Sequence, residues 1–383
     1  MTCREALNFT SVLYLGLRHP SASLRHWSQF TMGVPAALDE YQGGRRVAGM
    51  LAALQGCEDA ALAPSTLHVS WDLFGAFADS AVTIYQDEGV YPIIRWGVER
   101  AAGLGTPVRT FPHYDVDALN RMLEEDRYRR RLPVVVSDGI CPGCGKPAPV
   151  VEYLKCIQRF GGRLILDDTQ SLGILGRDHC ACAPYGRDGG GVLPWSNIRG
   201  NPHVLVVTSL AKGFGVPVAA LSGSRETVKS FEAKSKTRVH CSPPSIAVIR
   251  AAEHALEVNA ERGDAIRLRL ARLVRYFRNK LREIGLFSTG GLFPAQTLSS
   301  INGQAAAVLH ERLRRQGVNA VLHQGKGRQR GVPRISFLIN ARHRIADVDR
   351  AVEAMGHILS MKARRGLNAR VETERADSGF TDE

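Results

Sequence analysis

The feature that most constrains this chain is an alternation of short apolar runs with amphipathic stretches, between about residues 60 and 224. Each apolar run is flanked by Gly, Pro, Asp or Ser, as strands commonly are. The runs expected to be strands are 81–85, 132–136, 163–166, 204–207 and 217–221. Helices are expected between them, for example over 148–160. This rhythm predicts an α/β fold around a mostly parallel sheet that is buried on both faces.

A long helical region is expected from residue 245 to about 283, with a break near Glu261-Arg262-Gly263. Its second half carries apolar residues at spacings of three and four, which predicts an amphipathic helix. The remaining surface of that half would carry Arg267, Arg269, Arg272, Arg275 and Arg278. These arginines form either a solvated face or a docking surface for an acidic partner.

The C-terminal third predicts a smaller α+β domain. Its expected strands are 297–301, 320–322 and 335–339, and its expected helices are 303–316 and 345–358. The domain organisation predicted from the sequence is an N-terminal arm over 1–41, a large domain over 42–245, a small domain over 246–362 and a disordered tail over 363–383.

Composition narrows the possible classes of protein. With 383 residues, 44% of them hydrophobic, the chain suits a globular protein of roughly two domains and excludes a collagen or a disordered protein. No run approaches the ~18 apolar residues of a membrane span, and no signal peptide is evident, so we expect a cytoplasmic protein. The net charge of +13 suggests an anionic partner. Nucleic-acid binding is the non-enzymatic alternative, although no motif for it accompanies the charge.

Eight cysteines are too few for a disulfide scaffold in a chain of this length, so most are expected to be reduced. Cys141-Pro-Gly-Cys144, followed by His179-Cys180-Ala-Cys182, could supply four zinc ligands. The second segment lacks the usual zinc-site spacing. The alternative interpretation is that both segments are loops without a metal.

Lys212 stands directly after a predicted strand, in Thr208-Ser209-Leu-Ala-Lys212-Gly-Phe-Gly215. In an α/β protein, ligands bind where strands end, and a lysine amine there can form an imine with a carbonyl group. An isolated lysine at a strand end is more often structural or exposed to solvent.

Two further segments complete the pattern. An apolar strand delivers Asp167 and Asp168 to its end, where a carboxylate could pair with a protonated pyridine, cap a helix or bind magnesium. Upstream, Ser65, Thr66 and Leu67 open a helical stretch, and hydroxyls with free backbone amides at a helix start can bind a phosphate. A phosphate cradle, an acid and a lysine in this order describe a pyridoxal-phosphate (PLP) site.

The chain resembles the fold-type I PLP enzymes of the class I/II aminotransferase superfamily, and most closely their α-oxoamine synthase family. The resemblance spans nearly the whole chain. It is carried by Tyr14-Leu15-Gly16-Leu17, Asp167-Asp168-Thr169-Gln170-Ser171-Leu172-Gly173, the Lys212 segment, Ser242-Pro243-Pro244 and the stretch from Arg334 to His343. It implies a three-layer αβα large domain, a smaller α+β C-terminal domain, the cofactor PLP and a homodimer with a shared active site.

The resemblance also implies roles for individual residues. Lys212 would form a Schiff base with PLP and shuttle the substrate α-proton, and Asp167 would pair with the pyridinium nitrogen. Ser209, with Thr208 beside it, would contact the cofactor phosphate, and the backbone around Ser65, Thr66 and Leu67 would complete its cradle. Arg334 would bind the substrate carboxylate, although its spacing from His343 is two residues longer than the family's. His240 and Ser242 would lie in the segment offered to the partner's phosphate site.

Three departures from the family pattern concern the active site. Tyr91 stands where the family has a ring-stacking histidine, and a phenol cannot replace imidazole as an acid or base near neutral pH. Gln170 replaces a second histidine and can still donate a hydrogen bond to the cofactor. The Cys141 to Lys146 segment replaces a serine-rich loop.

These departures leave two main enzymatic hypotheses, with another PLP reaction such as decarboxylation or racemisation as a lesser alternative. The first is a decarboxylative condensation of an amino acid with an acyl thioester, carried on coenzyme A or on an acyl carrier protein. The second is an aminotransferase, for which an aromatic residue such as Tyr91 is ordinary.

Overall fold

The computed structural model describes residues 6–78, 80–325 and 331–360. The described chain divides into two compact units. The larger holds residues 12–271 and 340–342, and the smaller holds 6–11, 272–339 and the segment from 343 onward, apart from the positions outside the described ranges. The division therefore falls at Ala271, inside a long helix, whereas the sequence placed the domain boundary at 245. The predicted tail over 363–383 lies outside the described residues.

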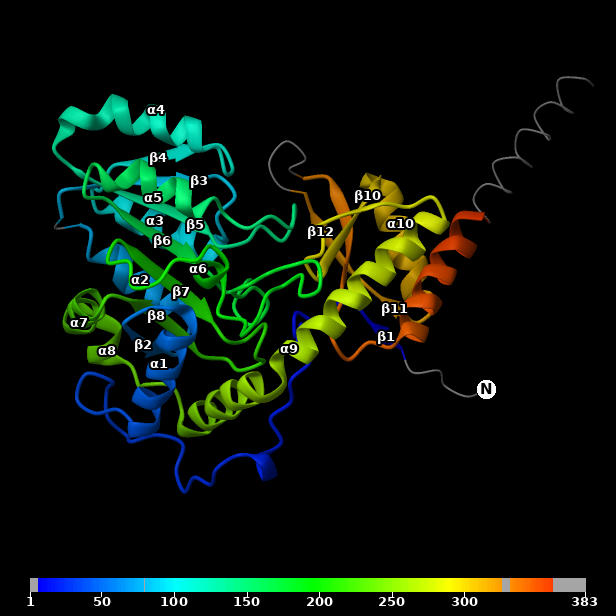
Figure 1. Ribbon diagram of the computed structural model, residues 1–383, viewed down its shortest axis with the longest axis horizontal. Coiled ribbons are helices and arrows are strands. Elements are labelled where there is room, and N and C mark those ends of the chain that lie inside the picture. Colours follow the sequence, from blue (N-terminus) through cyan, green and yellow to red (C-terminus); the bar gives the residue numbers. More distant parts are fainter. Residues whose placement is uncertain (1–5, 79, 326–330, 361–383) are drawn as a thin grey trace, which may run out of the picture. The chain divides into compact units, whose positions relative to one another are not determined.

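The larger unit is built around a seven-stranded sheet with the strand order β2-β8-β7-β6-β5-β3-β4 (Figure 1). Its strands are β2 (Asp59–Ala63), β3 (Val82–Asp87), β4 (Val108–Phe111), β5 (Leu132–Asp138), β6 (Arg163–Asp167), β7 (Val204–Ser209) and β8 (Ala219–Gly223). The five strands from β7 to β4 pair in parallel. All the expected strands of this region are present, while β2 and β4 were not predicted.

Strand β8 differs from the sequence-based expectation, because it runs antiparallel to both β7 and β2. The reason lies in the connection, since only residues 210–218 separate β7 from β8. A parallel crossover needs about a dozen residues or more. A link as short as this one therefore returns the chain in the opposite direction.

Helices cover both faces of this sheet, which makes three layers. The helices of the larger unit are α1 (Gln42–Gln55), α2 (Thr66–Gly75), α3 (Pro92–Gly103), α4 (Val116–Asp126), α5 (Val150–Gln158), α6 (Val192–Trp195), α7 (Arg225–Lys234) and α8 (Lys236–His240), with short 3-10 turns at Ser21–Ser23 and Arg127–Arg129. One apolar cluster joins Ile84 and Val134 of the sheet to α2 and α3. A second joins Tyr85 and Val135, the next residue of each strand, to α4 and α5. Alternate residues thus pack on opposite faces, as in a sheet buried on both sides.

The smaller unit contains an antiparallel sheet with the order β12-β13-β10-β9 and a separate parallel pair, β1-β11. The bounds are β1 (Leu7–Asn8), β9 (Ser288–Thr289), β10 (Ala295–Asn302), α10 (Gly303–Arg315), β11 (Val318–Asn319), β12 (Val321–Gln324) and β13 (Pro333–Leu338). Residues 345–360 are helical as well. The expected α/β architecture with a smaller α+β unit is therefore confirmed.

The long helix α9 (Ile246–Glu283) is continuous, so the predicted break near Gly263 is wrong. Gly263 instead makes room for a buried side chain, since a Cβ atom there would lie 2.8 Å from Nη2 of Arg267. Arg267 is 1% exposed and donates to the carbonyl of Gly173 at 3.0 Å, to Asn259 Oδ1 at 2.7 Å and to Asp264 at 2.6 Å. It is thus not the surface arginine that the sequence predicted.

Two other arginines of α9 make hydrogen bonds within their own units, although Arg269 is exposed and Arg278 is partly buried. Arg269 donates to the carbonyl of Ala341 at 2.6 Å, and Arg278 donates to Gln296 at 2.9 Å. Arg272 and Arg275 are exposed, as expected. Burial removes Arg267 from the predicted arginine surface, which Arg269, Arg272 and Arg275 retain, and the role of that surface as a solvated face or a docking surface stays a prediction.

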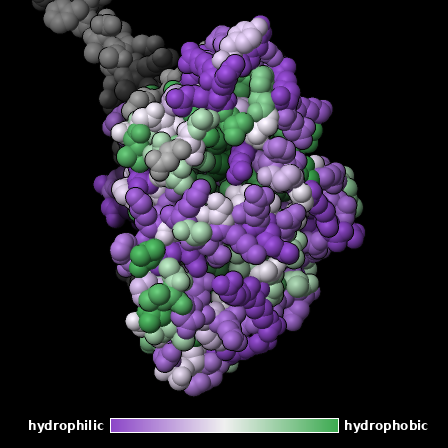
Figure 2. All heavy atoms as spheres, turned by 90° about the vertical axis from the view of Figure 1, so that its left-hand side faces the viewer, coloured by the Kyte–Doolittle hydropathy of each residue, from purple (hydrophilic) through white to green (hydrophobic). Residues whose placement is uncertain are grey.

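Hydrophilic side chains predominate on the face drawn in Figure 2, and apolar ones occur there in small groups. Within the described residues, no helix combines the length and apolar character needed to cross a membrane.

Candidate active site

Two neighbouring strand ends bring the predicted acid and lysine into one region of the larger unit. Asp167 is the last residue of β6 and pairs in register with Val207 of the adjacent parallel strand β7. Strand β7 ends at Ser209, and Lys212 follows in the next turn. The two loops are hydrogen-bonded to each other, since the Ser209 N–H donates to Thr169 Oγ1 at 3.0 Å. The carboxylate and the amine therefore stand on adjoining loops at the same sheet edge.

The two consecutive aspartates have different surroundings. Asp167 is 6% exposed, and its Oδ1 accepts a hydrogen bond from the Thr169 N–H at 3.0 Å. Asp168 is buried and accepts from the Ser171 hydroxyl and from the Val192 N–H, the latter at 3.1 Å. Burial raises the pKa of Asp168 to about 7, against the opposing effect of those hydrogen bonds. Asp168 thus connects the segment after β6 to the start of α6 through hydrogen bonds.

Lys212 faces an aromatic ring, since its Nζ lies 5.0 Å from the centroid of Tyr91. Tyr91 precedes the first turn of α3 and is 40% exposed. Its N–H donates to Oδ1 of Asp138, the last residue of β5, at 3.0 Å. The structure therefore brings together Tyr91 and Lys212, as a ring-stacking role for the tyrosine requires.

The turn after Lys212 is held in place from two sides. A Cβ atom on Gly213 would lie 2.5 Å from the Leu172 carbonyl, so only glycine allows this close approach. On the other side, Nε2 of His19 lies 2.7 Å from the Phe214 carbonyl, and Nδ1 of His19 lies 3.0 Å from Nδ1 of His254. Burial lowers the pKa of His19, which favours the neutral ring in this pair.

Gln170 receives a hydrogen bond that the sequence did not predict. The Tyr14 hydroxyl donates to Gln170 Oε1 at 3.1 Å, and Tyr14 is 1% exposed. Tyr14 belongs to a motif that carried the family resemblance, but its side chain had no role assigned. The contact holds the Gln170 amide, so that its NH2 group is the end left to reach a ligand.

The expected phosphate cradle lies at the same sheet edge. In register, Ala63 of β2 pairs with Ala219 of β8, which pairs with Ser209 of β7, and Ser65 follows β2 directly. Helix α2 begins at Thr66, with Leu67 in its first turn, so their N–H groups are among the unbonded donors of a helix start. Ser65 Oγ lies 2.9 Å from His68 Nδ1.

Thr208 adds an unsatisfied group near this edge. Its side chain is buried, and Oγ1 has no hydrogen-bond partner within the described residues. Ser209 next to it accepts a hydrogen bond from the Ala211 N–H at 3.2 Å. An unpaired buried hydroxyl is costly, so this position fits a site where a polar ligand completes the bonding.

Three further predicted residues belong to other segments of the chain. Arg334 is part of β13 in the smaller unit, where it donates to the Leu298 carbonyl at 3.1 Å, and its role stays a prediction. His240 ends α8 and is exposed. Ser242 lines a small pocket together with Pro64 and His68, next to the start of α2.

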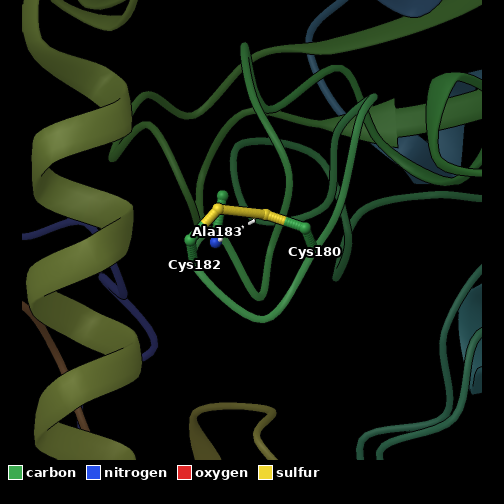
Figure 3. Close-up of a disulfide and its surroundings, with 3 residues drawn as sticks. All are labelled: Cys180, Cys182 and Ala183. Atoms are coloured by element: carbon green, nitrogen blue, oxygen red, sulfur yellow. Dashed lines mark hydrogen bonds between the residues drawn. A yellow bond between two sulfur atoms is a disulfide. The ribbon is translucent and has the colours of Figure 1, made fainter.

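The predicted zinc set does not assemble. Cys180 and Cys182 form a disulfide with a Cα–Cα distance of 5.3 Å (Figure 3), so their sulfurs are not available as ligands. His179 stacks on Trp195 with ring centroids 3.7 Å apart. The five other described cysteines are free, as expected. Two of them, Cys141 and Cys144, meet His113 instead, which the sequence did not indicate.

The sequence matches known proteins over most of its length. Residues 69–355 match the family model described as aminotransferase class I and II. An 8-amino-7-oxononanoate synthase of Sodalis glossinidius (strain morsitans) is 29% identical over 362 residues, covering 92% of this chain and 88% of that protein.

Two solved structures share the fold. A serine palmitoyltransferase from S. paucimobilis, solved with a bound PLP–myriocin aldimine, has a TM-score of 0.78 at 16% identity and covers 91% of this chain and 86% of its own. An 8-amino-7-oxononanoate synthase from Francisella tularensis has a TM-score of 0.73 at 15% identity and covers 94% of this chain and 99% of its own.

The chain belongs to the class I and II aminotransferase family. It is a PLP-dependent transferase, so the cofactor and this class of enzyme, both predicted from the sequence, are confirmed.

Proposed function

We propose that this protein catalyses the decarboxylative condensation of an amino acid with an acyl thioester, using PLP held at the edge formed by β6 and β7. The observation that carries the proposal is the 5.0 Å approach of the Lys212 amine to the Tyr91 ring, beside the loop of Asp167. The similarity to an 8-amino-7-oxononanoate synthase supports condensation over other PLP reactions.

The residues present fit the cofactor. Lys212 would hold it covalently, Asp167 would pair with its ring nitrogen, and Tyr91 would stack on the ring. Thr208, whose Oγ1 lacks a partner within the described chain, would bind the phosphate together with Ser209 and the start of α2. When bound, PLP acts as an electron sink that stabilises a carbanion at the amino-acid α-carbon.

The protein's own groups then have separate tasks. Lys212 places its amine against the stacking ring, and we assign it the transfer of the α-proton. Asp167 is an almost fully buried carboxylate and would keep the paired nitrogen protonated. Gln170, fixed through Tyr14, would donate a hydrogen bond to the cofactor's phenolic oxygen. Arg334 would hold the substrate carboxylate by a two-point contact.

The acyl donor would be a thioester of coenzyme A or of an acyl carrier protein. Both are anionic, and the net charge of +13 would attract them. We also propose a homodimer in the cytoplasm, with His240 and Ser242 in the segment that reaches the partner's phosphate site.

The test is an incubation of the PLP-loaded protein with carboxyl-labelled amino acids, singly, with and without acyl-CoA or acyl carrier protein thioesters. The proposal predicts labelled carbon dioxide and an α-amino ketone only when a thioester is present. Lys212→Ala should abolish both products, and Arg262→Ala, an exposed position on α9, serves as the control.

The aminotransferase hypothesis remains the second candidate because Tyr91 is an ordinary stacking residue for that chemistry. It predicts conversion of the amino acid to its 2-oxo acid, with the label retained, and only when a 2-oxo acid acceptor is supplied. That result, with no release of carbon dioxide, would overturn the condensation proposal.

A further inference from the structure

A second cluster of reactive side chains, from the segments after β4 and β5, contains none of the residues assigned to PLP. One ring nitrogen of His113 and the sulfurs of Cys141 and Cys144 all lie within 4.8 Å of one another. In a tetrahedral zinc site with bonds of about 2.0–2.3 Å, ligand atoms stand roughly 3.5–4 Å apart. The three groups thus need little movement to share one ion.

The histidine is already oriented for such a role. Nδ1 of His113 lies 2.8 Å from Oδ1 of Asp87, a carboxylate with no exposed surface. Nε2 is buried and has no hydrogen-bond partner of ordinary geometry within the described residues. A carboxylate on one ring nitrogen, with the other nitrogen directed at the ion, is the usual arrangement around a zinc-binding histidine.

The two cysteines lie on a tight loop that presents both sulfurs to the same side. The loop is closed by the Cys141 N–H to the Lys146 carbonyl at 3.0 Å and by the Gly145 N–H to the Cys141 carbonyl at 2.7 Å. Gly145 has φ +70°, which favours glycine. The Cys144 N–H lies 3.5 Å from the Cys141 sulfur, a contact that would stabilise a thiolate.

We propose that His113, Cys141 and Cys144 bind one zinc ion, with Asp87 as the positioning residue and a solvent-derived fourth ligand. Two thiolates and an imidazole select zinc or a similar thiophilic ion over magnesium or calcium. Cys144 is exposed, which leaves an open side for the fourth ligand.

The site would stabilise one wall of the active-site region. Asp138 ends β5 three residues before Cys141, and its carboxylate accepts the Tyr91 N–H at 3.0 Å. An ion that closes the Cys141 loop onto His113 would therefore fix the strand end from which Tyr91 is positioned.

The test measures zinc in the PLP-loaded full chain, kept reduced and dialysed against metal-free buffer after exposure to Zn²⁺. We expect one zinc per chain in the unmodified protein and less than about a tenth of that in Cys141→Ser/Cys144→Ser. The matched control, Cys180→Ser/Cys182→Ser, removes a different pair of cysteines and should keep the full zinc content.

Two single variants guard against misfolding of the double one. His113→Gln should lower the zinc affinity, and Asp87→Asn should lower it by about 10- to 100-fold. Co²⁺ in place of zinc should give a thiolate-to-metal absorption band that the cysteine variant lacks.

The proposal is overturned if the reduced protein takes up no zinc at saturating Zn²⁺, or if uptake is equal in all variants, which would mean adventitious binding. It also fails if Cys141 and Cys144 form a disulfide that excludes the ion even under reducing conditions.

Discussion

The amine of Lys212 lies 5.0 Å from the centroid of the Tyr91 ring, although the two residues come from loops after different strands. Strand β7 precedes the lysine and β3 precedes the tyrosine, and β6 and β5 lie between these two strands in the sheet. The strand ends of one sheet edge thus assemble a lysine, a ring and the Asp167 carboxylate.

The ring of Tyr91, rather than its hydroxyl, should matter for cofactor binding. Tyr91→Phe keeps the stacking surface, so we expect a PLP dissociation constant close to that of the unmodified protein. Tyr91→Ala removes the ring and should weaken PLP binding by about 2- to 13-fold, the size of an aromatic pair interaction. Titration of the cofactor-free protein with PLP measures both. Equal weakening in the two variants would contradict a stacking role.

Asp168 should make stability depend on pH. Its pKa in the folded protein is about 7, above the ordinary value of 3.8, because burial disfavours the charged form. The folded state therefore holds the proton more tightly than the unfolded chain, and this contribution to stability falls as the pH rises from about 4 to about 7.

Asp168→Asn removes that dependence while keeping an oxygen for the Val192 N–H. The difference in unfolding free energy between variant and unmodified protein should shift in favour of the variant as the pH rises through this window. Denaturant unfolding at several pH values measures it. A difference that stays constant would show that Asp168 titrates outside the window.

Arg267 should be important for stability, although it has no assigned role in binding PLP. Arg267→Ala would leave the Gly173 carbonyl and Asn259 Oδ1 without their donor, at a cost of ~2–4 kcal/mol in unfolding free energy. Arg267→Lys should recover only part of this, since one ammonium cannot reproduce the planar set of donors.

The exposed Arg262, on the same helix, is the matched control, and Arg262→Ala should change the unfolding free energy by no more than about 0.5 kcal/mol. If both alanine variants were equally stable, the buried arginine would be contributing nothing through its hydrogen bonds.

The sequence located the Lys212 region well because its signals are local. Asp167 ends one buried apolar strand and Lys212 follows another. Parallel strands bring their ends to one edge, so the pattern predicts that the two residues lie close together. The antiparallel direction of β8 could also have been predicted, because it follows from the short link that precedes the strand.

The histidine of the second cluster could not be predicted in the same way. His113 follows β4 and Cys141 follows β5. These two strands flank β3 in the sheet and run parallel, so the segments after them lie at the same sheet edge, where the two residues meet. Local spacing does not reveal that order, so the sequence analysis grouped the cluster's cysteines with His179, which stands next to Cys180. The burial of Arg267 was not predicted for a related reason. Helical periodicity treats every arginine as polar and cannot detect the space beside Gly263 that the Arg267 side chain fills.

The most direct test of the account is to find which lysine carries PLP. Borohydride reduction of the PLP-loaded protein fixes the cofactor to its lysine and blocks tryptic cleavage there. We predict one modified peptide, spanning residues 200–225 with the added group on Lys212, and none from the Lys212→Ala variant. Stoichiometric labelling of a different lysine, or no labelling in protein saturated with PLP, would contradict the assignment of Lys212 and the function built on it.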